Sequence, residues 1–229
     1  MSDSMRARAK LYGTTAFREE LIDGLGLAVH SRRILACVDF LLEDGRLPSP
    51  SESNATALAA DAALIIASIG SLQTNRKAVL SVSDSLCAMT LDCAVTSRAE
   101  IERPTGAVPP TFSADLAELF PEMWSAPSGA FRQGLCHTAV SIFRGDPHGV
   151  RLFGVLDRWS AKRKQFYTNG VRPFLTHPAF ANFVSPEHGG LLLMPAAIAN
   201  FADLLGASVA DTAASIGSRR RTAKNRRRQ

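Results

Sequence analysis

The stretch RLFGVLDRWSAKRKQFYTNGVR, residues 151–172, decides the predicted fold. On a helix with about 3.6 residues per turn, its basic residues Arg151, Arg158 and Lys162 fall in one narrow stripe. A neighbouring apolar stripe is formed by Leu152, Val155, Trp159 and Phe166. This pattern predicts an amphipathic helix from Arg151 to Tyr167 that packs on a core through one side and presents cations beside it.

The cations of the stretch 151–172 are candidate ligands for a phosphate chain. They are Arg151, Arg158, Lys162, Arg163, Lys164 and Arg172, against the single acid Asp157. Trp159 and Tyr167 could stack on bases. The alternative is an ordinary amphipathic helix with core aromatics and solvated charges, and the sequence leaves both interpretations open.

Helical periodicity continues on both sides of this stretch. Apolar residues at helical spacing predict helices after a cap at Thr14 or Thr15, and over 31–43, 55–69, 76–95, 114–120, the segment after Ser128, 191–205 and 208–216. Pro121 is expected to close the helix at 114–120. Alternation with a period of two never lasts, so strand signals are weak. We therefore predict an all-α protein.

Breaks in this periodicity suggest the domain boundaries. The segment 103–111, RPTGAVPPT, contains three prolines and cannot be helical, and 48–54 is a shorter proline- and serine-containing linker. We predict a flexible N-terminal arm at 1–14, a helical lobe at 15–102, a second helical lobe at 112–217 and a disordered basic tail at 218–229.

The positive charge of the chain is concentrated at its C-terminus. Residues 219–229, RRRTAKNRRRQ, hold seven of the 26 basic residues and no acid, which leaves 19 bases and 21 acids elsewhere. The seven are Arg219, Arg220, Arg221, Lys224, Arg226, Arg227 and Arg228. Such a tail repels itself and favours a polyanion, and guanidinium groups bind phosphates in a bidentate manner. A localisation signal, a solubilising tail or an acidic protein partner are the alternatives.

Two smaller basic pairs extend the candidate surface. Arg32 and Arg33 open the predicted helix at 31–43, and Arg76 and Lys77 open the one at 76–95. Cations at a helix N-terminus oppose the helix dipole, and a bound phosphate would relieve that conflict. We therefore include all four in the predicted RNA-binding set.

Other functional classes find little support in the sequence. Nucleotide-binding loops, hydrolase elbows and zinc-protease motifs are absent, so we predict no enzyme, no catalytic residues and no cofactor. The four cysteines form no CxxC pair, and we expect buried thiols and no metal site. No apolar run is long enough to span a membrane, and the N-terminus lacks the apolar stretch of a signal peptide. We expect a soluble, intracellular protein.

Three stretches together resemble nucleocapsid proteins of the phenuivirus group, which includes phleboviruses and tenuiviruses. They are TFSADLAELFPEMW (111–124), RPFLTHPAFANFV (172–184) and LLLMPAAIANFADLLG (191–206). The resemblance implies an all-helical protein of two lobes, with single-stranded RNA in the basic cleft between them and an N-terminal arm that docks on the next protomer. The resemblance also implies that Arg76 and Lys77 correspond to that family's basic residues at a helix junction.

The sequence thus predicts a viral nucleocapsid or coat protein that coats single-stranded RNA without sequence specificity and forms homo-oligomers along it. A viral polymerase is a further expected partner, and the expected location is the virion and the host cytoplasm. The alternatives are a cellular or phage-encoded DNA- or RNA-binding regulator with an accessory basic tail, and an enzyme without a recognisable motif.

Overall fold

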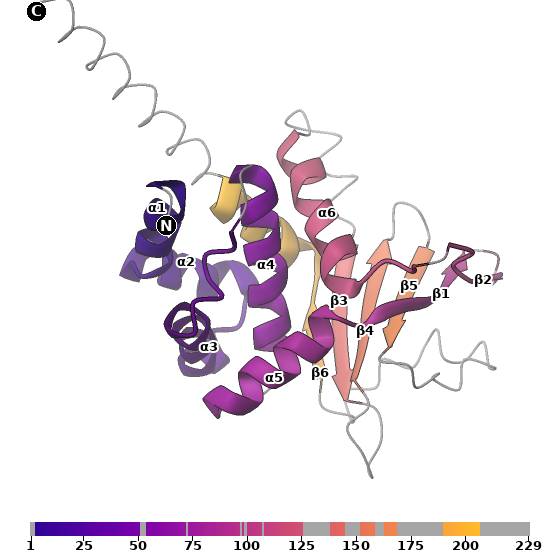
Figure 1. The fold of residues 1–229 in the computed structure, drawn as a ribbon, viewed down its shortest axis with the longest axis horizontal. Coiled ribbons are helices and arrows are strands. Elements are labelled where there is room, and N and C mark those ends of the chain that lie inside the picture. The colour runs from indigo at the N-terminus through magenta and orange to yellow at the C-terminus, as the bar shows by residue number, and fades with distance from the viewer. Residues whose placement is uncertain are drawn as a thin grey trace, which may run out of the picture.

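The computed structural model combines helices with a six-stranded antiparallel sheet (Figure 1). It describes residues 3–50, 54–71, 73–96, 98, 100–106, 108–125, 138–144, 152–158, 163–168 and 190–206. The strand order is β2-β1-β5-β4-β3-β6. The prediction of an all-α protein is therefore wrong, and all the described strands lie after residue 87.

The N-terminal helices largely confirm the predicted periodicity. Helix α2 (Thr15–Leu25) begins where the Thr14 hydroxyl accepts the Phe17 amide at 3.2 Å, as an N-cap should. Gly26 ends it with φ of 65°, in the left-handed region that favours glycine. The short turn η1 (Ala28–His30) leads to α3 (Ser31–Glu43), and α4 (Asn54–Gly70) follows.

The predicted flexible arm is wrong, because most of it forms helix α1 (Asp3–Tyr12) and is anchored to the core. Arg8 and Tyr12 are buried, and both donate to Oδ2 of Asp61 on α4, at 2.7 and 2.6 Å. Oδ1 of Asp61 accepts the Ser49 amide at 2.6 Å. A buried carboxylate with these partners ties α1 to the loop before α4.

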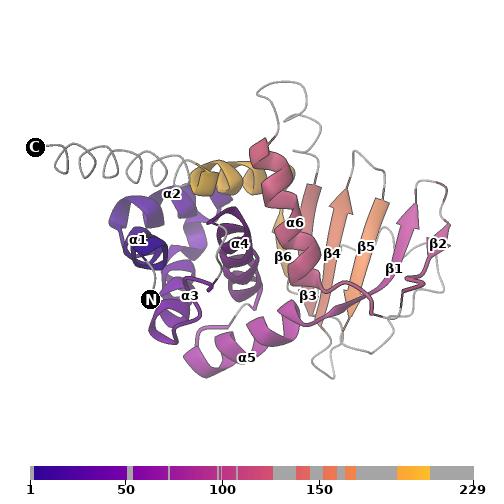
Figure 2. The ribbon, with the colours of Figure 1, turned by 45° about the horizontal axis from the view of Figure 1, so that its top comes forward.

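Helix α4 lies at the centre of the molecule (Figure 2), between α1–α3 on one side and α6 with the sheet on the other. Its alanine-rich sequence lets neighbouring elements approach closely. A Cβ added at Gly70 would lie 2.2 Å from Cδ1 of Ile142 on β3, so only glycine fits at this contact without a shift.

The predicted helix at 76–95 is only half correct. Helix α5 (Arg76–Cys87) begins as predicted, with the Asn75 side chain accepting the Ala78 amide. The chain then forms strand β1 (Thr90–Thr96), which pairs with the two-residue strand β2 (Ile101–Glu102). The Cys93 side chain turns to the opposite face from Leu91 at a β-bulge, which disguises the strand alternation.

The stretch that decided the prediction is a β-hairpin, not a helix. Strand β4 (Leu152–Arg158) pairs with β5 (Arg163–Thr168) from Phe153↔Thr168 to Arg158↔Arg163. Strand β3 (Thr138–Arg144) pairs with β4. The helix predicted after Ser128 is therefore wrong over residues 138–144. Sheet pairing supplies the hydrogen bonds here, and it outweighs a helical pattern of apolar residues.

Helix α6 (Phe112–Ser125) runs through Pro121 instead of ending there. At its start, the Thr111 hydroxyl accepts the Ala114 amide at 3.2 Å. Phe120, just before the proline, packs edge-on against Phe201, and Trp124, beyond it, donates to the Ala202 carbonyl at 2.7 Å. These contacts with the helix at 195–206 offset the cost of an internal proline, which is about 3 kcal/mol.

The last predicted helices are partly corrected. Strand β6 (Gly190–Leu193) pairs with β3 and includes the first residues of the helix predicted at 191–205. The helix itself begins at residue 195. The helix predicted at 208–216 lies outside the described residues, as does the basic tail.

The two predicted lobes share one continuous core. Its largest fully buried side chains come from both sides of the proline-rich segment 103–111, namely Tyr12, Tyr167, Phe17, Phe112, Phe120 and Phe201. The sheet contributes one face to this core, whereas Cys93, Val155 and Phe166 form a small cluster on its other face. The described residues therefore form one body, without the predicted basic cleft between two helical lobes.

Candidate nucleic-acid interface

Of the two basic residues at the start of α5, Arg76 faces carboxylates. Arg76 forms ion pairs with Glu43 at 3.2 Å and with Asp44 at 3.6 Å, both at the C-terminal end of α3. Lys77 is exposed. The cation that the helix dipole disfavours at this position is therefore compensated within the protein, and a phosphate would have to compete with two carboxylates for Arg76.

The pair at the start of α3 lies apart from Arg76. Arg32 is exposed and Arg33 is half-buried, and both stand at the opposite end of α3 from Glu43. A helix of 13 residues is about 20 Å long. The structure therefore does not bring Arg32 and Arg33 together with Arg76 and Lys77 in one groove.

The hairpin that replaces the predicted basic helix rearranges its cations. Arg158 and Arg163 are direct cross-strand partners on β4 and β5, on the sheet face that carries Leu156 and Tyr167 into the main core. Lys164 lies on the opposite face and pairs with Asp157 at 3.6 Å. Arg151, Lys162, Arg172 and all seven tail cations, with Trp159, lie outside the described residues.

A row of four side chains crosses strands β3, β4, β5 and β1 at the end of the sheet where β4 leads into β5. Thr138 pairs with Arg158, Arg158 with Arg163, and Arg163 with Thr96, so all four point to the same face. Like charges directly opposite one another in a sheet destabilise it. The Arg158–Arg163 pair, which we call the arginine pair, therefore requires nearby negative charge.

One carboxylate near the arginine pair is Asp115 on α6. It is buried and accepts from the Tyr167 hydroxyl and, at 3.3 Å, from Nε2 of Gln165. Burial and this carboxylate raise the pKa of Tyr167 above its ordinary value, while Arg158 and Arg163 oppose the rise. Both guanidinium groups therefore lie within electrostatic reach of the Tyr167 hydroxyl.

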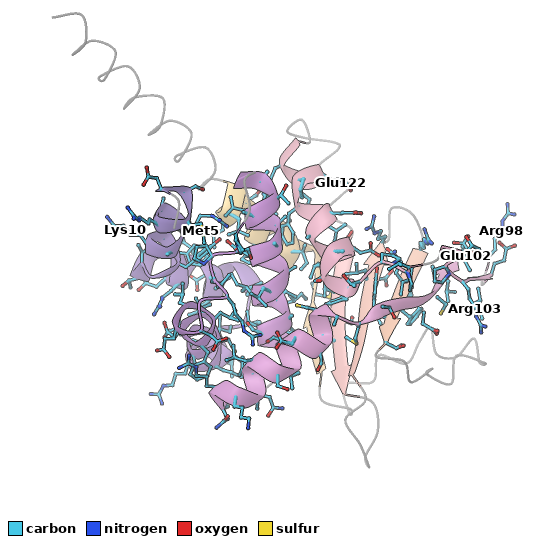
Figure 3. All side chains as sticks on the ribbon, viewed as in Figure 1. Met5, Lys10, Arg98, Glu102, Arg103 and Glu122 are labelled. Atoms are coloured by element: carbon cyan, nitrogen blue, oxygen red, sulfur yellow. The ribbon has the colours of Figure 1, made fainter. Side chains whose placement is uncertain are left out.

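A second carboxylate, Glu102 on β2, pairs with Arg163 at 3.1 Å in a setting open to solvent. The two side chains are 50% and 40% exposed. Figure 3 places Glu102 with Arg98 and Arg103 at the β1–β2 end of the sheet, away from the helices. Exposed ion pairs contribute about 0–1 kcal/mol, so Glu102 is a weakly held partner.

Two donors of the arginine pair and one acceptor beside it are unused. Nε of Arg158, Nε of Arg163 and Oε1 of Gln165 are buried and have no hydrogen-bond partner. Because Nε2 of Gln165 faces Asp115, its Oε1 atom is directed elsewhere. A buried polar atom without a partner costs about 1–3 kcal/mol, so this arrangement leaves binding capacity unused.

The sequence interpretation missed Thr138, Asp115, Gln165 and Glu102. It predicted that Tyr167 could stack on bases, whereas the structure buries this side chain completely, with its hydroxyl donating to Asp115. The available signal was the period-two pattern Arg163-Gln165-Tyr167 within RKQFYT, which places three polar-headed side chains on one face of a strand. The helical interpretation of 151–167 concealed it.

The described residues show no other obvious chemical centre. They contain no group of three or more His, Cys, Asp or Glu able to hold a metal. Cys37, Cys87 and Cys93 are free thiols, and burial raises their pKa to about 11, 12 and 11. Such thiols are protonated and unreactive at neutral pH. Cys136 lies outside the described residues.

Comparison with known proteins found no match. No protein-family model, no curated protein and no solved structure matches it. Across the part of the chain that the structure describes, no helix is long and apolar enough to cross a membrane.

Proposed function

We propose that this protein binds single-stranded RNA without sequence specificity and assembles along it, as a nucleocapsid or coat protein does. The observation that carries the proposal is the separation of charge along the chain. Seven of its 26 basic residues lie in the last eleven positions with no acid among them, while the rest has a slight excess of acids. A segment of this kind gains most from a polyanion, through the release of condensed counterions.

The sheet supports this proposal with a second type of contact. The arginine pair presents two guanidinium groups side by side, whose planar shape suits phosphate oxygens. Phosphate contacts carry no sequence information, which fits binding to RNA of any sequence. The nucleocapsid assignment now depends on charge, because the all-helical fold implied by the phenuivirus resemblance is not the fold observed.

Assembly along RNA needs a surface for the next protomer. Among the described strands, β2 and β6 are the two edges of the sheet, and Ile101 and Leu192 on them are exposed. An edge strand offers backbone donors and acceptors to another chain. Contact with a viral polymerase, and a place in a virion or the host cytoplasm, stay predictions.

The test is purification of the full-length chain from a nucleic-acid-rich lysate, followed by measurement of its nucleic-acid content and particle mass before and after nuclease. The proposal expects co-purified RNA and particles that become smaller when the RNA is digested. A nucleic-acid-free monomer would overturn it, and selective binding to one duplex DNA sequence would favour the regulator instead.

A further inference from the structure

We propose that the arginine pair, Arg158 and Arg163, is a binding site for a backbone phosphodiester of RNA, and that Glu102 occupies this site in the free protein. This inference deepens the proposed function and rests on it. It identifies one discrete site on the folded body, distinct from the basic tail, and a residue that regulates it.

The first argument is electrostatic. Two arginines that are direct cross-strand partners repel each other, and each needs an anion close by. Asp115 is already engaged by the Tyr167 hydroxyl and the Gln165 amide. Glu102 reaches Arg163 through one ion pair, from Oε2 to Nη2 at 3.1 Å. A carboxylate thus lies where a phosphate oxygen would bind.

The second argument is that Glu102 can leave. Strand β2 has only two residues, Ile101 and Glu102, and both are exposed at the edge of the sheet. Neither burial nor a long hydrogen-bonded ladder holds the carboxylate in place. Its ion pair with Arg163 is half exposed, and water and salt weaken such pairs. An anion with better geometry can therefore displace it.

The third argument concerns what an incoming phosphate would gain. The free state leaves the Nε donors of Arg158 and Arg163 without acceptors. A phosphodiester offers two unesterified oxygens and can bridge both guanidinium groups, whereas Glu102 reaches only Arg163. A rearrangement that brings the Nε groups to phosphate oxygens satisfies donors that the carboxylate leaves unsatisfied.

The experiment measures the affinity of full-length protein for a fluorescein-labelled oligouridine by anisotropy, with matched pairs of variants. Glu102→Gln removes the competing carboxylate, and Glu100→Gln removes an equal charge two residues away. Since an exposed pair is worth about 0–1 kcal/mol, E102Q should tighten binding about two- to fivefold relative to E100Q. Thermal unfolding of each variant checks that it is folded.

Loss of the site is tested in the same way. Arg163→Gln should weaken binding more than Arg103→Gln, which removes an equal charge from the exposed β1–β2 region. In the double variant E102Q/R163Q the gain from E102Q should disappear, because Glu102 acts only through the arginine pair. A gain that persists without Arg163 would overturn the inference.

The outcomes separate this inference from the proposed function. RNA binding by the wild-type chain, with E102Q and E100Q indistinguishable, would refute the site and leave the function standing. Failure of the wild-type chain to bind RNA would refute both. Polyglutamate serves as the competitor: if E102Q increased its affinity more than that of RNA, the site would belong to an acidic protein partner and not to phosphate.

Discussion

Replacing Asp61 by asparagine should destabilise the protein severely, because this carboxylate holds helix α1 in place. Asp61 is fully buried, and its two oxygens accept from Arg8, Tyr12 and the Ser49 amide at 2.6–2.7 Å. The asparagine side chain would keep the size of the original but leave the buried guanidinium of Arg8 without a counter-ion. Breaking a buried ion pair in this way costs about 3–5 kcal/mol.

Urea unfolding of the full-length chain, followed by circular dichroism, measures this loss. With a denaturant dependence of about 2–3 kcal/mol per molar, the midpoint should fall by roughly 1–2 M. Asp23→Asn, which removes an exposed carboxylate on α2, should move the midpoint by less than about 0.3 M, as surface substitutions usually do. The combined change Arg8→Met and Asp61→Leu should recover part of the loss, since it removes both charges.

A midpoint for Asp61→Asn equal to that of Asp23→Asn would refute the reasoning. It would mean that Arg8 finds water or another acceptor, and that α1 is not fastened to the core as the structure shows. The result would restore the mobile N-terminal arm predicted from the sequence.

Further predictions concern titration and packing. Burial, with carboxylate neighbours, raises the pKa of both tyrosines, Tyr12 and Tyr167, above 10. Ultraviolet titration should therefore show phenolate only as the protein unfolds. The free energy of unfolding should fall as pH rises above about 10. Burial also raises the pKa of the Cys37 thiol from 9.0 to about 11. The protonated thiol therefore stabilises the folded state below pH 9, and this contribution to the free energy of unfolding falls by roughly 2–3 kcal/mol by pH 11. Cys37→Ala should flatten the dependence of the unfolding free energy on pH between these values. Gly70→Ala should cost about 1–3 kcal/mol through its clash with Ile142, and Ile142→Val should restore part of this in thermal unfolding; full stability in the single variant would show that the contact has room.

The sequence predicted the helical half well, because local signals decide it. Neighbouring residues determine the cap predicted at Thr14 or Thr15, the helix at 31–43 and the start of the helix at residue 76. The sheet was missed because it depends on partners far along the chain: β1 pairs with β5, and β3 with β6. Without those partners, the apolar residues of 151–167 fit a helix as well as two strands.

The candidate site could be predicted only in part, because its residues also come together through contacts between distant parts of the chain. Composition alone picks out Arg158 and Arg163 as members of a basic stretch, but only strand register makes them neighbours. Glu102 and Asp115 come from other elements altogether, and no local pattern links them to residue 163. The Arg76 contact with Glu43 and Asp44 is likewise set by how α5 packs on α3.

The most direct test of the central claim is the dependence of RNA affinity on salt. The association constant for an oligouridine is measured between about 50 and 200 mM salt for the full-length chain and for a chain in which all seven bases of 219–229 are replaced by glutamine. If those seven cations and the arginine pair all contact phosphates of a single strand, the logarithmic slope should approach about −6 in the full-length chain and fall to roughly −1 to −2 in the variant, where only the arginine pair binds. Equal slopes for the two chains would contradict the account.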